Sequence, residues 1–223
     1  MKGRLVDLSY TLQPGGEQRK FVAEMVTSDQ VADVVWLPGQ WYIMHNIQMV
    51  SHIGTHVEVP YHIRRDGADT ATVPLERLVG EAVVLDLRGL PADAEVSREQ
   101  LEEAAAKAGG VREGDLVLLH TGWDRHWGTP EYGHSPYLSP AAMQWLVDQG
   151  AGLVGIDTHG AEVPHSEDHV NHHIMLDRGV PHIENLRNLG ALTRARVFLF
   201  AAPVAIVGME SFPLRVVALE YDE

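Results

Sequence analysis

Ser51-His-Ile-Gly-Thr-His-Val-Glu-Val-Pro-Tyr-His62 carries three histidines and a glutamate at even-numbered positions, which are His52, His56, Glu58 and His62. The odd positions from 53 to 59 hold isoleucine, threonine and valine, an alternation typical of a β-strand with one face against the core. The even-numbered side chains share the opposite face. The stretch therefore predicts a strand whose polar face carries ligands for a metal ion.

The spacing of these ligands fits a bound ion if the chain bends at one point. Extended residues two apart are about 6.6 Å apart, which lets His56 and Glu58 share an ion at about 2.0 to 2.2 Å from each ligand. Four extended residues span roughly 13 Å, so we expect Gly54 to bend the chain and bring His52 inward. Gly54 also leaves room for the ion. A helix fits worse, because Gly54 and Pro60 oppose it.

Two interpretations of this face stay open. The residues are either ordinary polar side chains on a solvent-facing strand or metal ligands. Neutral imidazole with carboxylate is the usual ligand set for zinc or manganese, which favours a divalent metal, one ion or two.

The string His52-x-Gly-Thr-His-x-Glu-x-Pro-x-His62 resembles the signature of the cyclase family of metal-dependent hydrolases, the kynurenine formamidase and isatin hydrolase type. That signature usually has aspartate where this chain has Glu58. The resemblance implies a swivelling β/β/α-like fold and a metal site that includes His52, His56 and Glu58. It also implies a catalytic role for His62.

A second cluster of histidines and acids lies between residues 154 and 189 and also resembles the family. The resemblance makes His172 and Glu184 metal ligands. On a helix, His172 shares a face with apolar neighbours and so points inward. The adjacent His173 is the alternative if the frame is shifted by one residue. Where the family usually has Asp-x-x-Ser-Val-Asp, residues 157–162 read Asp-Thr-His-Gly-Ala-Glu, which implies a different pocket that His159 either faces or leaves for the surface.

Composition bounds the rest of the chain. With 223 residues and 45% hydrophobic content, it is long enough for one well-buried domain, which we assign to residues 1–223. The formal net charge is −14 and no basic run occurs, so nucleic acid is an unlikely partner by charge. The absence of cysteine leaves histidines and carboxylates for the chemistry. No apolar run reaches the length of a membrane span, and the N-terminus lacks a signal core, so we expect a cytoplasmic protein.

Strand and helix patterns alternate along the chain, which predicts an α/β domain with flanking helices. Hairpin patterns near the N-terminus indicate that the sheet is mixed and not purely parallel. The expected strands are 4–12, 32–37, 41–50, 83–87, 116–119, 152–157, 197–207 and 214–219. Helices are expected after a Ser97 capping box, after Ser139-Pro140 and over 171–178. A hairpin turning at Pro38-Gly39 is expected to lead into the metal strand.

We predict a metal-dependent hydrolase of a small amide, formamide or cyclic amide, of the arylformamidase type. A divalent ion brings the pKa of its water from about 15.7 to about 7 and polarises a carbonyl, and His62 serves as general base and then acid. His62 is alternatively a further ligand or a capping residue. The competing functions are a metal-dependent cyclase or lyase acting on a small carbonyl compound, and a metal-binding module without catalysis.

The expected partners are a small-molecule substrate and further copies of the chain. Four tryptophans are candidates for an aromatic pocket wall: Trp36, Trp41, Trp123 and Trp127. The family resemblance implies self-association, and the loop from residue 123 to 137 is rich in aromatic residues, so we expect a homodimer or homotetramer.

Overall fold

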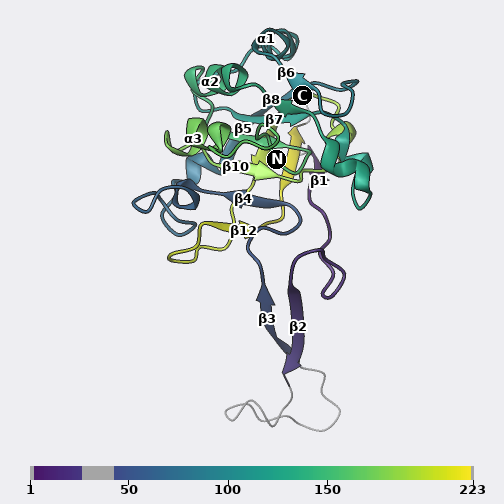
Figure 1. Ribbon diagram of the computed structural model, residues 1–223, viewed down its shortest axis with the longest axis vertical. Coiled ribbons are helices and arrows are strands. Elements are labelled where there is room, and N and C mark those ends of the chain that lie inside the picture. The colour runs from purple at the N-terminus through teal and green to yellow at the C-terminus, as the bar shows by residue number, and fades with distance from the viewer. Residues whose placement is uncertain (1–2, 27–42, 222–223) are drawn as a thin grey trace.

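A mixed nine-stranded sheet with helices on one side forms the body of the protein (Figure 1). The computed structural model describes residues 3–26 and 43–221. Along the sheet the order is β1-β13-β11-β5-β7-β9-β10-β4-β12, with β5, β7, β9 and β10 parallel and the other pairs antiparallel. The predicted α/β domain with a mixed sheet is confirmed. The strands are β1 (Gly3–Asp7), β4 (His56–Glu58), β5 (Val79–Asp86), β7 (Leu116–His120), β9 (Leu153–Ile156), β10 (His182–Glu184), β11 (Arg196–Phe200), β12 (Ser211–Pro213) and β13 (Val217–Tyr221).

The described residues contain three α-helices, and two begin at the caps that the sequence predicts. Ser97 accepts a hydrogen bond from the Gln100 amide while the Gln100 side chain accepts one from the Ser97 amide, which is a complete capping box. The Ser139 hydroxyl accepts from the Ala142 amide. The helices are α1 (Arg98–Lys107), α2 (Pro140–Asp148) and α3 (Val170–Leu176), and 3-10 turns cover Pro60–His62, Leu75–Arg77, Trp123–His126, Pro130–His134 and Leu189–Ala191.

Alternate residues of the central strands enter two different cores, because successive side chains of a strand point to opposite faces. In β7, Val117 and Leu119 pack with the helices, whereas Leu116 and Leu118 face a second core that the curled sheet encloses. Val57 and Ile183 belong to this second core. The polar face of β4 and β10 is therefore turned toward the helices.

A two-stranded ribbon of β2 (Phe21–Val26) and β3 (Met44–Met49) extends away from the body (Figure 1). β3 lies within the predicted strand 41–50, and a hairpin does lead into the metal stretch. Its partner is β2, which the sequence interpretation had not assigned, and the predicted strand 32–37 with its turn lies outside the described residues. A second small sheet pairs β6 (Glu95–Val96) with β8 (Tyr137–Leu138).

Several predicted strands were longer than the observed ones. β1 ends at Asp7 and not at residue 12, β11 ends at Phe200 and not at residue 207, and β4 begins only at His56. Pro203 follows the end of β11, and proline cannot donate a ladder hydrogen bond. Within the described ranges, no helix is long and apolar enough to cross a membrane.

Candidate metal centre

The site is built on one face of two neighbouring strands. β4 pairs antiparallel with β10, which places His56 opposite Glu184 and Glu58 opposite His182. The residues between them, Val57 and Ile183, are fully buried on the other face. Four titratable side chains thus form a square on the face turned toward α3.

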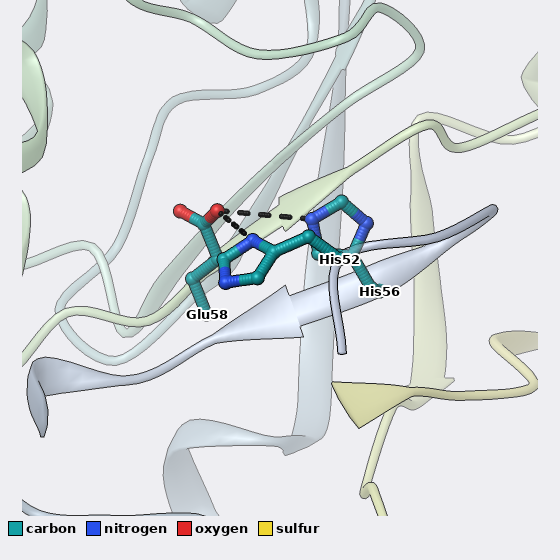
Figure 2. A group of neighbouring side chains, drawn as sticks. All are labelled: His52, His56 and Glu58. Carbon is teal, nitrogen blue, oxygen red and sulfur yellow. Dashed lines mark ion pairs between the residues drawn. The ribbon is translucent and has the colours of Figure 1, made fainter. Parts of the chain in front are cut away.

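His52 joins this square through a bend at Gly54. The predicted bend is confirmed, because Gly54 has φ +53° and His52 Nδ1 lies 2.9 Å from Glu58 Oε1 (Figure 2). The expected reason for the glycine was wrong in part. A Cβ at Gly54 would overlap the Leu12 side chain, so the glycine accommodates Leu12 and a left-handed backbone and does not keep a space open for an ion.

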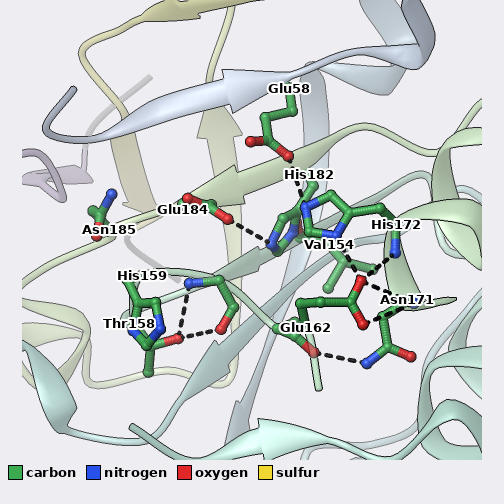
Figure 3. A network of polar contacts seen from close by, with 12 residues as sticks. Glu58, Val154, Thr158, His159, Glu162, Asn171, His172, His182, Glu184 and Asn185 are labelled. Carbon is green, nitrogen blue, oxygen red and sulfur yellow. Dashed lines mark hydrogen bonds and ion pairs between the residues drawn. The ribbon is translucent and has the colours of Figure 1, made fainter. Parts of the chain in front are cut away.

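The helix α3 brings His172 to the other oxygen of Glu58. His172 Nε2 lies 3.2 Å from Glu58 Oε2, and His172 Nδ1 lies 2.7 Å from Glu162 Oε2 (Figure 3). His173 instead pairs with Asp177 on the exposed side of the helix, at 3.0 Å. Of the two adjacent histidines, His172 is the one that faces the site.

His62 lies at the edge of the cluster, at the end of the 3-10 turn Pro60–His62. Its Nε2 is 3.9 Å from Glu58 Oε1, and its ring lies 4.7 Å from the ring of His52. The side chain is 30% exposed, more than the 16% of His52 or the 10% of His172. This position suits a group that exchanges protons with a ligand or with solvent.

The pKa values of the two carboxylates in the square, Glu58 and Glu184, are shifted in opposite directions. Burial raises the pKa of Glu58, but its contacts with the imidazoles of His172, His52 and His56 outweigh burial, and the net pKa lies well below its usual value. Burial, followed by the charge of Glu58, raises the pKa of Glu184. The site therefore holds one firmly ionised carboxylate and a second whose negative charge is costly without a cation.

The charged form of His172 is strongly favoured in the absence of a cation. Burial lowers its pKa, but the contacts with Glu162 and Glu58 outweigh burial and raise it to about 10. A bound cation has to displace this proton before the nitrogen can act as a ligand.

The donor atoms fit a divalent metal. Among the described residues, His56 Nε2 and Glu58 Oε2 are buried without a hydrogen-bond partner, and His56 Nδ1 contacts the Gly54 carbonyl oxygen at 2.9 Å, which leaves Nε2 free to bind. His56 Nε2 is 3.4 Å from Glu184 Oε2 and 3.7 Å from Glu58 Oε1. Ligands of a tetrahedral ion are about 3.3 Å apart when each is about 2.0 Å from it.

Ligand-type atoms gather in three sets, each within 4.8 Å of one another, in the described part of the chain. Two of the sets share Glu58, whose oxygens face different histidines. The sets are His52, His56 and Glu58; Glu58, His62 and His172; and Glu162, His169 and His172. All of the predicted ligands except Glu184 belong to one of these sets, and Glu184 contacts His56.

A cavity of about 290 Å³ adjoins the cluster. It is lined by the ligand candidates His52, His56 and Glu184 and by the aromatic side chains Trp127 and Tyr132. His159 also lines it, which places this histidine at the pocket and not on the open surface. Trp127 stacks on Tyr10 with ring centroids 3.9 Å apart. Of the other proposed wall residues, Trp123 is buried with 4% exposure and does not line the cavity, and Trp36 and Trp41 lie outside the described residues.

Besides His169 of the third set, three acidic or imidazole side chains at the site were not identified from the sequence. Glu162 holds His172 and accepts hydrogen bonds from three backbone amides, those of residues 163, 171 and 172. Glu210 lies 3.4 Å from His52 Nε2, immediately before β12. His182 faces the site from β10, two residues before Glu184. Of these, only His182 could have been predicted from the sequence. It lies two residues before the predicted ligand Glu184, and residues two apart on a strand share a face.

The comparisons with known proteins agree with this geometry. The model of a family described as "Putative cyclase" matches residues 6–163. The kynurenine formamidase of Salinibacter ruber is 31% identical over 177 residues, covering 77% of each chain. Isatin hydrolase A from Labrenzia aggregata has a TM-score of 0.80 at 27% identity, covering 97% of this chain and 93% of its own.

A third solved structure, described as a potential metal-dependent hydrolase with cyclase activity, has a TM-score of 0.76 at 25% identity over the whole of both chains. The family model covers the metal stretch and the strands β4, β5, β7 and β9, and the solved structures share the fold over nearly the full length. The chain belongs to the cyclase family of metal-dependent hydrolases.

Proposed function

We propose that this protein is a metal-dependent hydrolase that cleaves the carbon–nitrogen bond of a small amide, formamide or cyclic amide, a bond other than a peptide bond. The observation that carries the proposal is a buried cluster of imidazole and carboxylate groups that opens directly into a small cavity. A structural metal site is closed on all sides, whereas a catalytic site keeps an open position, so the cavity favours catalysis over metal storage.

The site would hold zinc or manganese, as one ion or two, through His52, His56, Glu58, His172 and Glu184. Imidazole nitrogens with carboxylate oxygens suit both metals. When bound, such an ion supplies Lewis-acid activation of water and of the substrate carbonyl. Glu162 fixes the orientation of His172 by accepting from its Nδ1, as a carboxylate commonly does behind a metal-binding histidine.

His62 is the candidate for proton transfer. Burial is the main cause that lowers its pKa from the usual value, so the ring is neutral and able to accept a proton at neutral pH. In the proposed reaction His62 Nε2 accepts a proton from the attacking water and returns it to the leaving nitrogen. Its side chain is 30% exposed at the edge of the cluster, so solvent can exchange protons with it.

The cavity suggests the class of substrate. A volume of about 290 Å³ fits a molecule of one or two rings, and Trp127 and Tyr132 offer aromatic surfaces for it. The Tyr132 hydroxyl donates to Asn185 Oδ1 at 2.8 Å, which fixes the orientation of that ring. Two of the relatives are named for aromatic substrates, kynurenine formamides and isatin, and this chain is proposed to act on aryl amides of similar size.

The test is hydrolysis by the metal-free protein and by the protein reconstituted with zinc or manganese, on matched formanilides, lactams and lactones. Release of a carboxylate and an amine only after reconstitution is the expected result. Turnover of lactones alone, or proton exchange without cleavage, would support the cyclase or lyase alternative. Tight metal binding without turnover of any class would support a binding module.

We also propose a homo-oligomer, a homodimer or homotetramer, in the cytoplasm. In the aromatic-rich loop from residue 123 to 137, Trp123 and Tyr132 are buried, and only Trp127 is among the exposed large apolar side chains. The support comes instead from the ribbon of β2 and β3, which exposes several large apolar side chains. These are Met25, Ile43, Met44, Ile47 and Val50, with exposures between 38% and 60%.

A further inference from the structure

His182 occupies the fourth corner of the square formed by β4 and β10, and the other three corners are proposed metal ligands. The register places His182 opposite Glu58, just as Glu184 lies opposite His56. Side chains directly opposite each other in an antiparallel pair have Cβ atoms about 4.5 to 5.5 Å apart. His182 is therefore held by the same backbone ladder that positions the ligands, and it faces the same side of the sheet.

The ring of His182 is oriented so that one nitrogen is left free. Nδ1 lies 2.8 Å from the Val154 carbonyl oxygen on β9, and because a carbonyl only accepts, Nδ1 carries the hydrogen. Nε2 then presents a lone pair. His56 has the same arrangement, with Nδ1 on the Gly54 carbonyl oxygen. A backbone carbonyl behind a histidine is a common way to orient a metal ligand.

This nitrogen is buried and unpaired in the part of the chain that the structure describes. The His182 side chain is fully buried, and Nε2 has no hydrogen-bond partner among the described residues. Its nearest acidic atom is Glu184 Oε1 at 3.9 Å, and its ring lies 5.9 Å from the ring of His172 (Figure 3). A buried polar atom without a partner costs about 1 to 3 kcal/mol, which a bound ion would offset.

The two carboxylates of the square divide the ligands into two groups. Glu58 Oε1 faces His52 and His56, whereas Glu58 Oε2 faces His172. Glu184 Oε2 faces His56, whereas Glu184 Oε1 faces His182. Each carboxylate thus has one oxygen toward each group, so each would be able to contribute to two metal positions.

We infer that His182 Nε2 is a ligand of a second divalent ion, which it holds together with His172, Glu58 and Glu184. The inference rests on the proposal that this site binds a divalent metal. It gives the second position two imidazoles, matching His52 and His56 at the first. The glutamate at position 58, with an arm one methylene longer than aspartate, lies directly across from this additional ligand.

The test is zinc binding to the metal-free protein, followed by calorimetry and by metal analysis after dialysis. Wild type is expected to bind two ions per chain. His182→Leu should retain the first ion and bind the second at least about 100-fold more weakly. His120→Leu replaces another buried histidine, one without contacts to these ligands, and should bind both ions as wild type does.

The outcomes separate this inference from the proposed function. If wild type bound no metal, the proposed metal-dependent function would fail and this inference with it. If wild type and His182→Leu bound two ions with equal affinity, only the role of His182 would be overturned. Should His182→Leu not fold, a crystal structure of zinc-loaded wild type decides: an anomalous zinc peak about 2.1 Å from His182 Nε2 supports the ligand, and its absence there refutes it.

Discussion

At the scale of single residues, the proposal gives His62 a different role from the neighbouring ligand histidines. We expect His62→Ala to keep the metal content of wild type and to lower kcat by about 10² to 10⁴, the range for a lost general acid–base group. Metal analysis and steady-state kinetics on an active amide check this. Loss of metal in this variant would make His62 a ligand and not a base.

The pH profile of the wild type follows from the same assignment. A base works only when it is unprotonated, and the pKa of His62 is lowered, mainly by burial. We expect kcat of the wild type to fall at pH values below the usual histidine pKa of about 6.5. In His62→Ala this fall of kcat at acid pH should be absent. An unchanged acid limb in His62→Ala would assign it to another group.

Histidines inside and outside the cluster provide a matched test of the ligand set. We expect His172→Ala and His56→Ala to lose metal and activity together, because each leaves a buried carboxylate without its partner. His173→Ala removes an exposed histidine that pairs with Asp177 and should retain both. Metal content after dialysis is the measurement, and equal metal content in all three variants would contradict the assignment.

At the scale of elements, the turn before β4 positions His52. We expect Gly54→Ala to destabilise the protein by more than the about 1 to 2 kcal/mol of left-handed strain, because its Cβ also overlaps Leu12. Gly15→Ala is the control, since Gly15 has φ +75° with no atom within 4 Å of an added Cβ. Thermal unfolding and metal content measure the difference. Equal effects of the two substitutions would show that contact with Leu12 is unimportant.

The pairing of β1 with β13 includes a buried carboxylate whose effect depends on pH. Burial raises the pKa of Glu220, but hydrogen bonds from Arg4, Thr193 and Arg194 outweigh it and lower the net pKa. A lowered folded pKa stabilises the protein above the unfolded value of about 4.3 and loses this stabilisation as the pH falls below it.

We therefore expect Glu220→Gln to lower the free energy of unfolding by about 1 to 3 kcal/mol at pH 7 and by progressively less below about pH 4.5. Urea unfolding at several pH values measures this difference. A cost that stayed constant down to pH 3 would show that the charge of Glu220 does not contribute.

At the scale of the whole molecule, the ribbon of β2 and β3 is the surface on which the proposed association would depend. We expect wild type to sediment as a dimer or larger species and Ile47→Glu to shift toward the 24.6 kDa chain. Ile47 is 60% exposed on the ribbon, and Leu75→Glu changes an equally apolar residue with 67% exposure elsewhere. Wild type sedimenting only as a monomer at micromolar concentration would rule out the proposed oligomer.

Much of the fold was predictable because its signals are local. The Ser97 capping box and the Ser139 cap each depend on residues within one helical turn, and the alternation in 53–59 depends only on the two-residue period of a strand. The bend at Gly54 was predictable for the same reason. The limits of β11 and the pairing of β2 with β3 could not be predicted in this way. A strand ends where its partner strand ends, and strand pairing joins segments that are not adjacent in the sequence.

By itself the sequence determined the type of site: imidazole and carboxylate side chains on one face of a strand, in a family of metal-dependent hydrolases. Only the tertiary structure decided which further groups join it. The register between β4 and β10 places His182 opposite Glu58, and the packing of α3 brings Glu162 behind His172. The physical reason is that metal ligands must meet within about 3 to 4 Å, a distance that the folded backbone sets and that spacing along the chain does not.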